Sequence, residues 1–181
     1  MQNTRYTITE QRGNTRIIKI NRPEVHNAIN FDLVTELKRE IGLCETNNKI
    51  SAVILTGEGS TSFSAGGDLN HVIKMSPNEA IQYANHVHEL LNQIEGLAKP
   101  VIAAINGFVL GGGCQIALAC DIIASVNAKI GQSEVKIGIS PGWGGTQRLP
   151  SVVGISKAKE LIYTGKIIDA NEAHRINSSI K

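Results

Sequence analysis

Two glycine-rich turns hold the residues of this chain whose type and spacing could do chemistry. The first, the glycine triplet at 111–113, lies between an apolar stretch at 101–105 and a second apolar run at 114–119. A strand that leads through glycines into a helix aims several backbone N–H groups at one point, because the first N–H groups of a helix have no partner inside it. The helix dipole adds roughly half a positive charge at that end. The turn therefore predicts a site for an anion, or for an oxygen that becomes one.

The second glycine-rich turn, at 63–68, contains Gly66, Gly67 and Asp68. If the two turns meet, the N–H groups of Gly67 and Gly112 form a two-donor oxyanion site built from separate loops. Glycine suits both positions because a ligand must approach the backbone closely. One such donor stabilises a transition state by roughly 3–4 kcal/mol in a dry site. An acidic residue, Glu134, lies downstream of both turns and adds weight to a catalytic interpretation.

Two other motif interpretations fit less well. Gly111 and Gly113 form the G-x-G of a dinucleotide-binding turn, with Glu134 near the position of an acidic ribose partner. However, the third glycine position of that motif is Ile116, and no βαβ unit of the usual length surrounds it. The segment 138–142 matches G-x-S-x-G, the serine hydrolase elbow. Its residue after the serine is Pro141, which has no N–H to donate to an oxyanion, so we reject this match.

Elements that would position these turns follow from hydrophobic spacing and turn residues. Strands are expected at 5–10, 15–20, 51–56, 101–105, 121–125 and, more briefly, 129–132. Helices are expected at 32–46, from a Ser76 capping box to a stop at Pro100, from the glycine triplet through 114–119, at 157–164, and from a capping box at 169–172. The remaining turns and loops are expected at 11–14, 57–61, 63–68 and 139–145. This alternation predicts a mixed α/β fold with layers on both sides of its sheets, in a single domain over residues 1–181.

Composition excludes several classes of function. The chain has 181 residues, 41% of them hydrophobic, and carries a net charge of only +2, which argues against nucleic acid as a partner. Its apolar runs are too short to predict a membrane span, and its polar N-terminus predicts no signal peptide. The three cysteines lack CxxC spacing, which favours the cytoplasm over an oxidising compartment. The five histidines show no metal-ligand spacing, so we expect no metal.

Five segments together resemble the crotonase superfamily, the enoyl-CoA hydratases and isomerases. They are residues 21–30, 63–69, 99–125, 131–150 and 164–173, and they cover nearly the whole chain in register. The resemblance implies a spiral of ββα units, followed in the family by C-terminal helices that this chain largely lacks. It also implies a homotrimer or a dimer of trimers, and no cofactor, since coenzyme A is part of the substrate.

Residue roles also come from this resemblance. It implies that the N–H groups of Gly67 and Gly112 bind the thioester oxygen of an acyl-CoA and that Glu134 is the catalytic carboxylate. The expected lining for coenzyme A and the acyl chain comprises Val25, His26, Ala28, Ala65, Gly67, Asp68, Leu69, Gly112 and Pro141. Trp143, in the loop at 139–145, either lines the acyl pocket or covers the core.

The chain departs from the family at two places. Hydratases of the family typically carry a second glutamate where this chain has Gln115, whose amide can hold a water molecule but cannot take its proton. One acid/base suits double-bond isomerisation, and hydration stays open beside it. The chain is either a fragment or lacks the helices that cover the acyl pocket in the family. A bare spiral would expose apolar surface, so we expect oligomers or poor stability, with weak activity. Both departures keep open a catalytically silent relative that binds acyl-CoA or serves in assembly.

Overall fold

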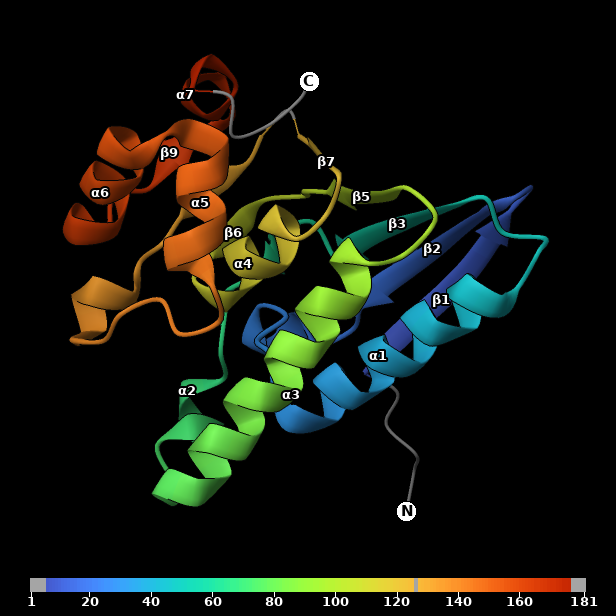
Figure 1. Cartoon of the computed structure of the whole chain (residues 1–181), viewed down its shortest axis with the longest axis horizontal. Helices are drawn as coiled ribbons and strands as arrows, with labels where there is room; N and C mark the ends of the chain where they lie inside the picture. Colours follow the sequence, from blue (N-terminus) through green and yellow to red (C-terminus); the bar gives the residue numbers. More distant parts are fainter. Residues whose placement is uncertain (1–5, 126, 177–181) are drawn as a thin grey trace.

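The structure, a computed structural model, describes residues 6–125 and 127–176 (Figure 1). Within these ranges the chain forms a five-stranded sheet and a four-stranded sheet with helices packed against them, which confirms the predicted mixed α/β class. None of the helices in these ranges is long and apolar enough to cross a membrane.

The larger sheet has the order β1 (Thr7–Arg12), β2 (Thr15–Ile20), β3 (Ala52–Gly57), β5 (Val101–Ala104) and β7 (Ile122–Ala124). β1 and β2 form an antiparallel hairpin, and the remaining neighbours pair in parallel. The predicted turn at 11–14 is too long, because β1 continues to Arg12 and leaves only Gly13 and Asn14 in the turn. Arg5, the predicted first residue of this hairpin, lies outside the described residues.

Two long helices, α1 (Phe31–Thr46) and α3 (Pro77–Glu95), lie side by side across the larger sheet (Figure 1). Each buries one apolar stripe, as the spacing predicts, and the buried positions include Leu37, Ile41, Val87 and Leu91. The predicted capping box is present: the Ser76 hydroxyl accepts from the Glu79 N–H, and the Glu79 carboxylate accepts from the Ser76 N–H. The helical spacing also places Ile81 on the α3 stripe, yet Ile81 is exposed, because the first turns of α3 extend beyond the sheet (Figure 1).

The smaller sheet has the order β4 (Ser62–Ser64), β6 (Phe108–Leu110), β8 (Lys129–Gly131) and β9 (Ile168–Asp169). β4, β6 and β8 pair in parallel. β4 and β6 were not predicted. β4 was assigned to the start of the glycine-rich turn at 63–68, and β6 was assigned to no element. Both are short and lie beside glycine-rich turns, where the turn residues outweigh the strand signal.

Shorter helices connect these layers: η1 (Pro23–Val25), α2 (Leu69–Val72), α4 (Gly112–Leu118), η2 (Glu134–Ile137), α5 (Gly145–Val153), α6 (Ile155–Thr164) and α7 (Ala170–Arg175). α4 opens on the glycine triplet, as predicted. α5 was not predicted, because glycines and an internal Pro150 hide its period. Asp169 caps α7 by accepting from the Glu172 N–H at 2.9 Å, which confirms a predicted cap.

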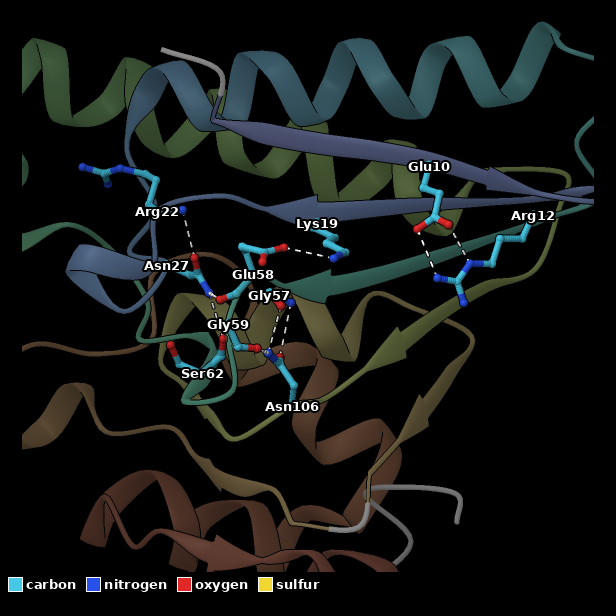
Figure 2. A network of polar contacts seen from close by, with 10 residues as sticks. All are labelled: Glu10, Arg12, Lys19, Arg22, Asn27, Gly57, Glu58, Gly59, Ser62 and Asn106. Atoms are coloured by element: carbon cyan, nitrogen blue, oxygen red, sulfur yellow. Dashed lines mark hydrogen bonds and ion pairs between the residues drawn. The ribbon is translucent and has the colours of Figure 1, made fainter.

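Two asparagine side chains cross-link the loops next to β3 (Figure 2). Asn27 donates to the carbonyls of Ser62 and Glu58 at 2.8 and 3.0 Å, and its Oδ1 accepts from the Arg22 N–H at 2.9 Å. Asn106 donates to the carbonyls of Gly57 and Gly59. Because Asn27 is fully buried and all these bonds reach backbone groups, the segment 22–29 is held firmly against the start of β4.

Candidate active site

A cavity of about 300 Å³ lies where α3, α4, η2 and the loop before α5 meet. It combines an apolar part with a small polar end. Its lining is Ala65, Gly66, Gly67, Leu69, Val72, Met75, Ala80, Tyr83, Gly111, Gly112, Gln115, Ser133, Glu134, Ile137, Ile139, Ser140, Gly142 and Trp143. The two predicted glycine donors and the predicted carboxylate therefore line one cavity, although they come from separate parts of the chain.

Strand pairing brings the two glycine turns together. β4 and β6 are parallel neighbours, and each leads directly into one of the turns. Gly66, with a φ of +98°, is so close to the second turn that a Cβ on it would lie 3.1 Å from the Gly112 nitrogen and 2.9 Å from the Leu110 carbonyl oxygen. Only glycine combines this left-handed backbone with such a close approach.

Neither candidate N–H group has a hydrogen-bond partner among the described residues. Gly67 forms an isolated bridge with Ile29. The Ile29 N–H donates to the Gly66 carbonyl and the Ile29 carbonyl accepts from the Asp68 N–H, each at 2.8 Å. Successive groups of an extended chain point to opposite sides, so the Gly67 N–H points away from Ile29. Gly112 is the first residue of α4, where no intrahelical partner exists. Among the described residues, no hydrogen bond uses either N–H.

Glu134 and Gln115 form the polar end of the cavity. The Gln115 amide nitrogen donates to Glu134 Oε1 at 2.6 Å and, more weakly, to Gln132 Oε1 at 3.3 Å. Glu134 Oε2 is buried and has no partner among the described residues. Burial raises the pKa of Glu134 above its ordinary value, and the Gln115 hydrogen bond only partly opposes this. The site therefore holds a carboxyl group with one tethered and one free oxygen.

The orientation of Gln115 is dictated by the backbone behind it. The Gly145 N–H, at the start of α5, donates to Gln115 Oε1 at 3.1 Å. Because this oxygen faces a donor, the amide nitrogen must face Glu134. The Gln115 amide group is thus engaged by protein atoms on both sides.

Trp143 covers the two glycines. A Cβ on Gly112 would lie 2.1 Å from Trp143 Cζ3, and one on Gly67 would lie 3.2 Å from Trp143 Cη2. The indole meets the Tyr83 ring edge-on, with ring centres 5.3 Å apart. Of the two roles weighed for Trp143, the structure shows that it lines the cavity. Tyr83 was missed, since its position in a buried helix stripe gives no sign of a cavity.

The other predicted lining residues divide into two groups. Ala65 and Leu69 lie in the cavity lining. Pro141 does not: it is buried, while its neighbours Ser140 and Gly142 face the cavity. Val25, His26, Ala28 and Asp68 also lie outside this lining. The Asp68 carboxylate is instead paired with Arg22 at 2.9 Å. Within the described part of the chain, no group of three His, Cys, Asp or Glu side chains could hold a metal ion.

Comparisons with known proteins agree on the family. The sequence model for "Enoyl-CoA hydratase/isomerase" matches residues 10–177. A short-chain-enoyl-CoA hydratase from Clostridium acetobutylicum is 48% identical over 93% of this chain. A crotonyl-CoA hydratase from Syntrophomonas wolfei is 45% identical over the same share. The chain spans 65% of the length of both relatives.

Solved structures show the same fold. An enoyl-CoA hydratase from Bacillus anthracis superposes with a TM-score of 0.90 at 35% identity, covering 97% of this chain and 69% of that chain. DspI from Pseudomonas aeruginosa gives a TM-score of 0.93 at 35% identity, with coverage of 99% and 68%. These likenesses confirm the crotonase-like fold expected from the sequence. The chain therefore belongs to the enoyl-CoA hydratase/isomerase family, the crotonase family.

Proposed function

We propose that this chain acts on acyl-CoA thioesters as an enoyl-CoA hydratase/isomerase, with Glu134 as the acid/base. One observation carries the proposal: a buried carboxylate oxygen lines the same cavity as two backbone N–H groups, and none of the three has a hydrogen-bond partner in the described part of the chain. The names of the relatives support enoyl-CoA as the substrate class. Coenzyme A belongs to the substrate, and the proposal needs no other cofactor.

In the proposed mechanism, the thioester oxygen accepts hydrogen bonds from the N–H groups of Gly67 and Gly112. Moving a proton at the α- or γ-carbon, or adding water to the double bond, places negative charge on that oxygen. Two preorganised donors stabilise this enolate without reorganising at the moment of reaction. The free Oε2 of Glu134 then takes up or returns the proton, and a raised pKa keeps both protonation states within reach.

Hydration and isomerisation are supported by different observations. The hydratase names of the relatives favour addition of water to a 2-enoyl-CoA. The amide at position 115 favours isomerisation, because a glutamine cannot take up a proton and Glu134 is left as the acid/base of this pair. Moving a proton between two carbons needs only one such group. A second glutamate at position 115 would supply the additional base that fast hydration uses.

The test offers both substrates to two proteins. Wild type and Gln115→Glu are each given 2-enoyl-CoA and 3-enoyl-CoA, and hydration and isomerisation are followed separately. We expect wild type to isomerise faster than it hydrates, and Gln115→Glu to raise hydration. Fast hydration by wild type that the substitution leaves unchanged would show that the missing carboxylate does not matter.

A silent relative that binds acyl-CoA without turnover is the second candidate, favoured by Gln115, which stands where hydratases of the family typically carry a glutamate. Binding of an enoyl-CoA with no turnover, unaltered in Glu134→Ala, would support it. The trimeric or hexameric assembly stays a prediction from the family resemblance, and the cytoplasmic location stays a prediction from the cysteines.

A further inference from the structure

A shielded ion pair lies next to one of the proposed oxyanion donors. Arg22 Nη1 and Asp68 Oδ2 are 2.9 Å apart, with the side chains only 13% and 14% exposed. The same nitrogen donates to the Ala28 carbonyl at 2.6 Å. The Tyr6 ring lies under the guanidinium, 5.7 Å from its carbon. Asp68 directly follows Gly67 in the chain, so this pair is built onto the donor loop.

The Asp68 carboxylate is not used for the local bond that its position offers. Asp68 is the N-cap residue of α2, a position where aspartate commonly accepts a backbone N–H, yet its side chain makes no such bond. Its carboxylate reaches Arg22 instead, 46 residues away. Because Asp68 forms an ion pair with Arg22 in place of a cap on α2, we interpret this ion pair as more than a local feature of the helix start.

Main-chain bonds tie the same loop to the same partner segment. The Asp68 N–H donates to the Ile29 carbonyl at 2.8 Å, and the Tyr83 hydroxyl donates to that carbonyl at 2.7 Å. The Gly66 carbonyl accepts from the Ile29 N–H. Gly67 is therefore clamped on both sides by residue 29, and Arg22 fastens residue 68 to residue 28 of the same segment. The direction of the Gly67 N–H depends on this clamp.

The charge of Asp68 matters as much as its position. A carboxylate one residue from an oxyanion donor would repel the negative charge that forms on the thioester oxygen, and low solvent exposure leaves this repulsion poorly screened. Arg22 supplies the opposite charge at hydrogen-bond distance and offsets that repulsion. Losing Arg22 alone would leave a poorly solvated carboxylate beside the donor.

We propose that Arg22 is a positioning residue of the active site: paired with Asp68, it aligns the Gly67 N–H and neutralises the carboxylate next to it. The inference rests on the proposed function, since it concerns the donor that function assigns to Gly67. It predicts that charge balance at positions 22 and 68 governs the strength of the oxyanion site.

The experiment compares wild type with Arg22→Met, Arg22→Lys, Asp68→Asn and the double variant Arg22→Met/Asp68→Asn. Lys19→Met is the matched control, because it removes the cation of another ion pair, Lys19–Glu58, which lies outside the cavity lining. Each protein is measured for kcat and KM with an enoyl-CoA and for thermal unfolding. The red shift of a bound chromophoric cinnamoyl-CoA gives a direct reading of how strongly the donors polarise the thioester carbonyl.

Removing one oxyanion donor costs about 100- to 1000-fold in kcat, so misaligning one in Arg22→Met is expected to cost about 10- to 100-fold. KM should change much less, and the red shift should shrink. Arg22→Lys should retain most of both readings because it keeps the charge. The double variant should recover kcat and red shift relative to Arg22→Met, since it removes the unbalanced carboxylate. Lys19→Met should match wild type.

Several results would overturn the inference. They are a folded Arg22→Met with wild-type kcat and red shift, a loss confined to KM, or a double variant no better than Arg22→Met. If Arg22→Met does not fold, Asp68→Asn decides, because it breaks the same pair, and a folded Asp68→Asn with wild-type kcat and red shift would overturn the inference. Wild type that neither turns over enoyl-CoA nor shifts the probe would instead refute the proposed function.

Discussion

Glu134 is a carboxylic acid only 9% exposed to solvent, and one of its two oxygens has no hydrogen-bond donor among the described residues. Desolvation disfavours its charged form and raises its pKa above 4.5. Its folded pKa is thus above its unfolded one. The protonated group stabilises the fold below about pH 4.5, and this contribution is lost as pH rises through the folded pKa.

We therefore predict that Glu134→Gln separates activity from stability. At pH 7 the variant should lose about 100- to 10,000-fold in kcat, the usual contribution of an acid/base group. It should unfold at the same or a higher temperature than wild type at pH 7, and this difference should vanish at pH 4. As the pH is lowered, wild-type kcat/KM should decrease with a midpoint above pH 4.5.

Glu160→Gln, on the surface of α6, is the control and should change neither property. Glu134→Gln with wild-type kcat would remove Glu134 from the mechanism. For each pH, the unfolding temperature of wild type is subtracted from that of Glu134→Gln. A difference that is lower at pH 7 than at pH 4 would contradict the raised pKa of Glu134.

Contacts between elements set the shape of the cavity. The first turn of α4 lies directly beneath Trp143, in the loop before α5, and the closest approach leaves no room for a side chain at Gly112. The same contact brings the indole against Gly67. One aromatic ring thus keeps two separate glycine turns free of side chains and defines the end of the cavity.

This contact predicts a strong coupling between positions 112 and 143. Gly112→Ala should destabilise the protein by about 1–3 kcal/mol through overpacking. In Gly112→Ala/Trp143→Ala the clash is gone, so the combined loss should be smaller than the sum of the two single losses. Urea unfolding of all four proteins measures the coupling.

Gly142→Ala is the matched control, because the nearest atom to its added Cβ lies 4.0 Å away and its φ is not left-handed. We expect little change in its unfolding free energy. Additive losses at 112 and 143 would mean that α4 and the loop shift apart more easily than the packing implies.

At the scale of the whole molecule, the cavity opens beside apolar surface. Large hydrophobic side chains near it and on α6 are well exposed, among them Ile73, Ile81, Ile155 and Tyr163, with Ile73 83% exposed. Exposed apolar groups of this kind promote association. The chain spans 65% of the length of its relatives from Clostridium acetobutylicum and Syntrophomonas wolfei.

We predict that the 181-residue chain self-associates as its concentration rises. Light scattering across a concentration series should show a growing mean mass, and Ile155→Gln should reduce it by removing an exposed apolar group. Lys159→Gln, on the same helix, should not. A monodisperse monomer at all concentrations would contradict this prediction.

The sequence alone determined the features that depend on neighbouring residues. The α1 and α3 stripes, the Ser76 and Asp169 caps and the glycine opening of α4 were all predicted, because a helix and its caps are defined within a few positions. The glycine turns and Glu134 were identified from type and spacing, and the family resemblance supplied their roles. The short strands β4 and β6 and the helix α5 were missed because their local signals are weak.

Only the tertiary structure decided which distant groups meet. Parallel pairing of β4 with β6 brings the glycine turns together, and the Gly145 N–H turns the Gln115 amide toward Glu134. The family resemblance implied that Asp68 belongs to the substrate lining, and the tertiary structure pairs its carboxylate with Arg22. These contacts join residues 19 to 46 positions apart. Side chains at such separations meet through the packing of whole sheets and helices, and no local spacing rule encodes that packing.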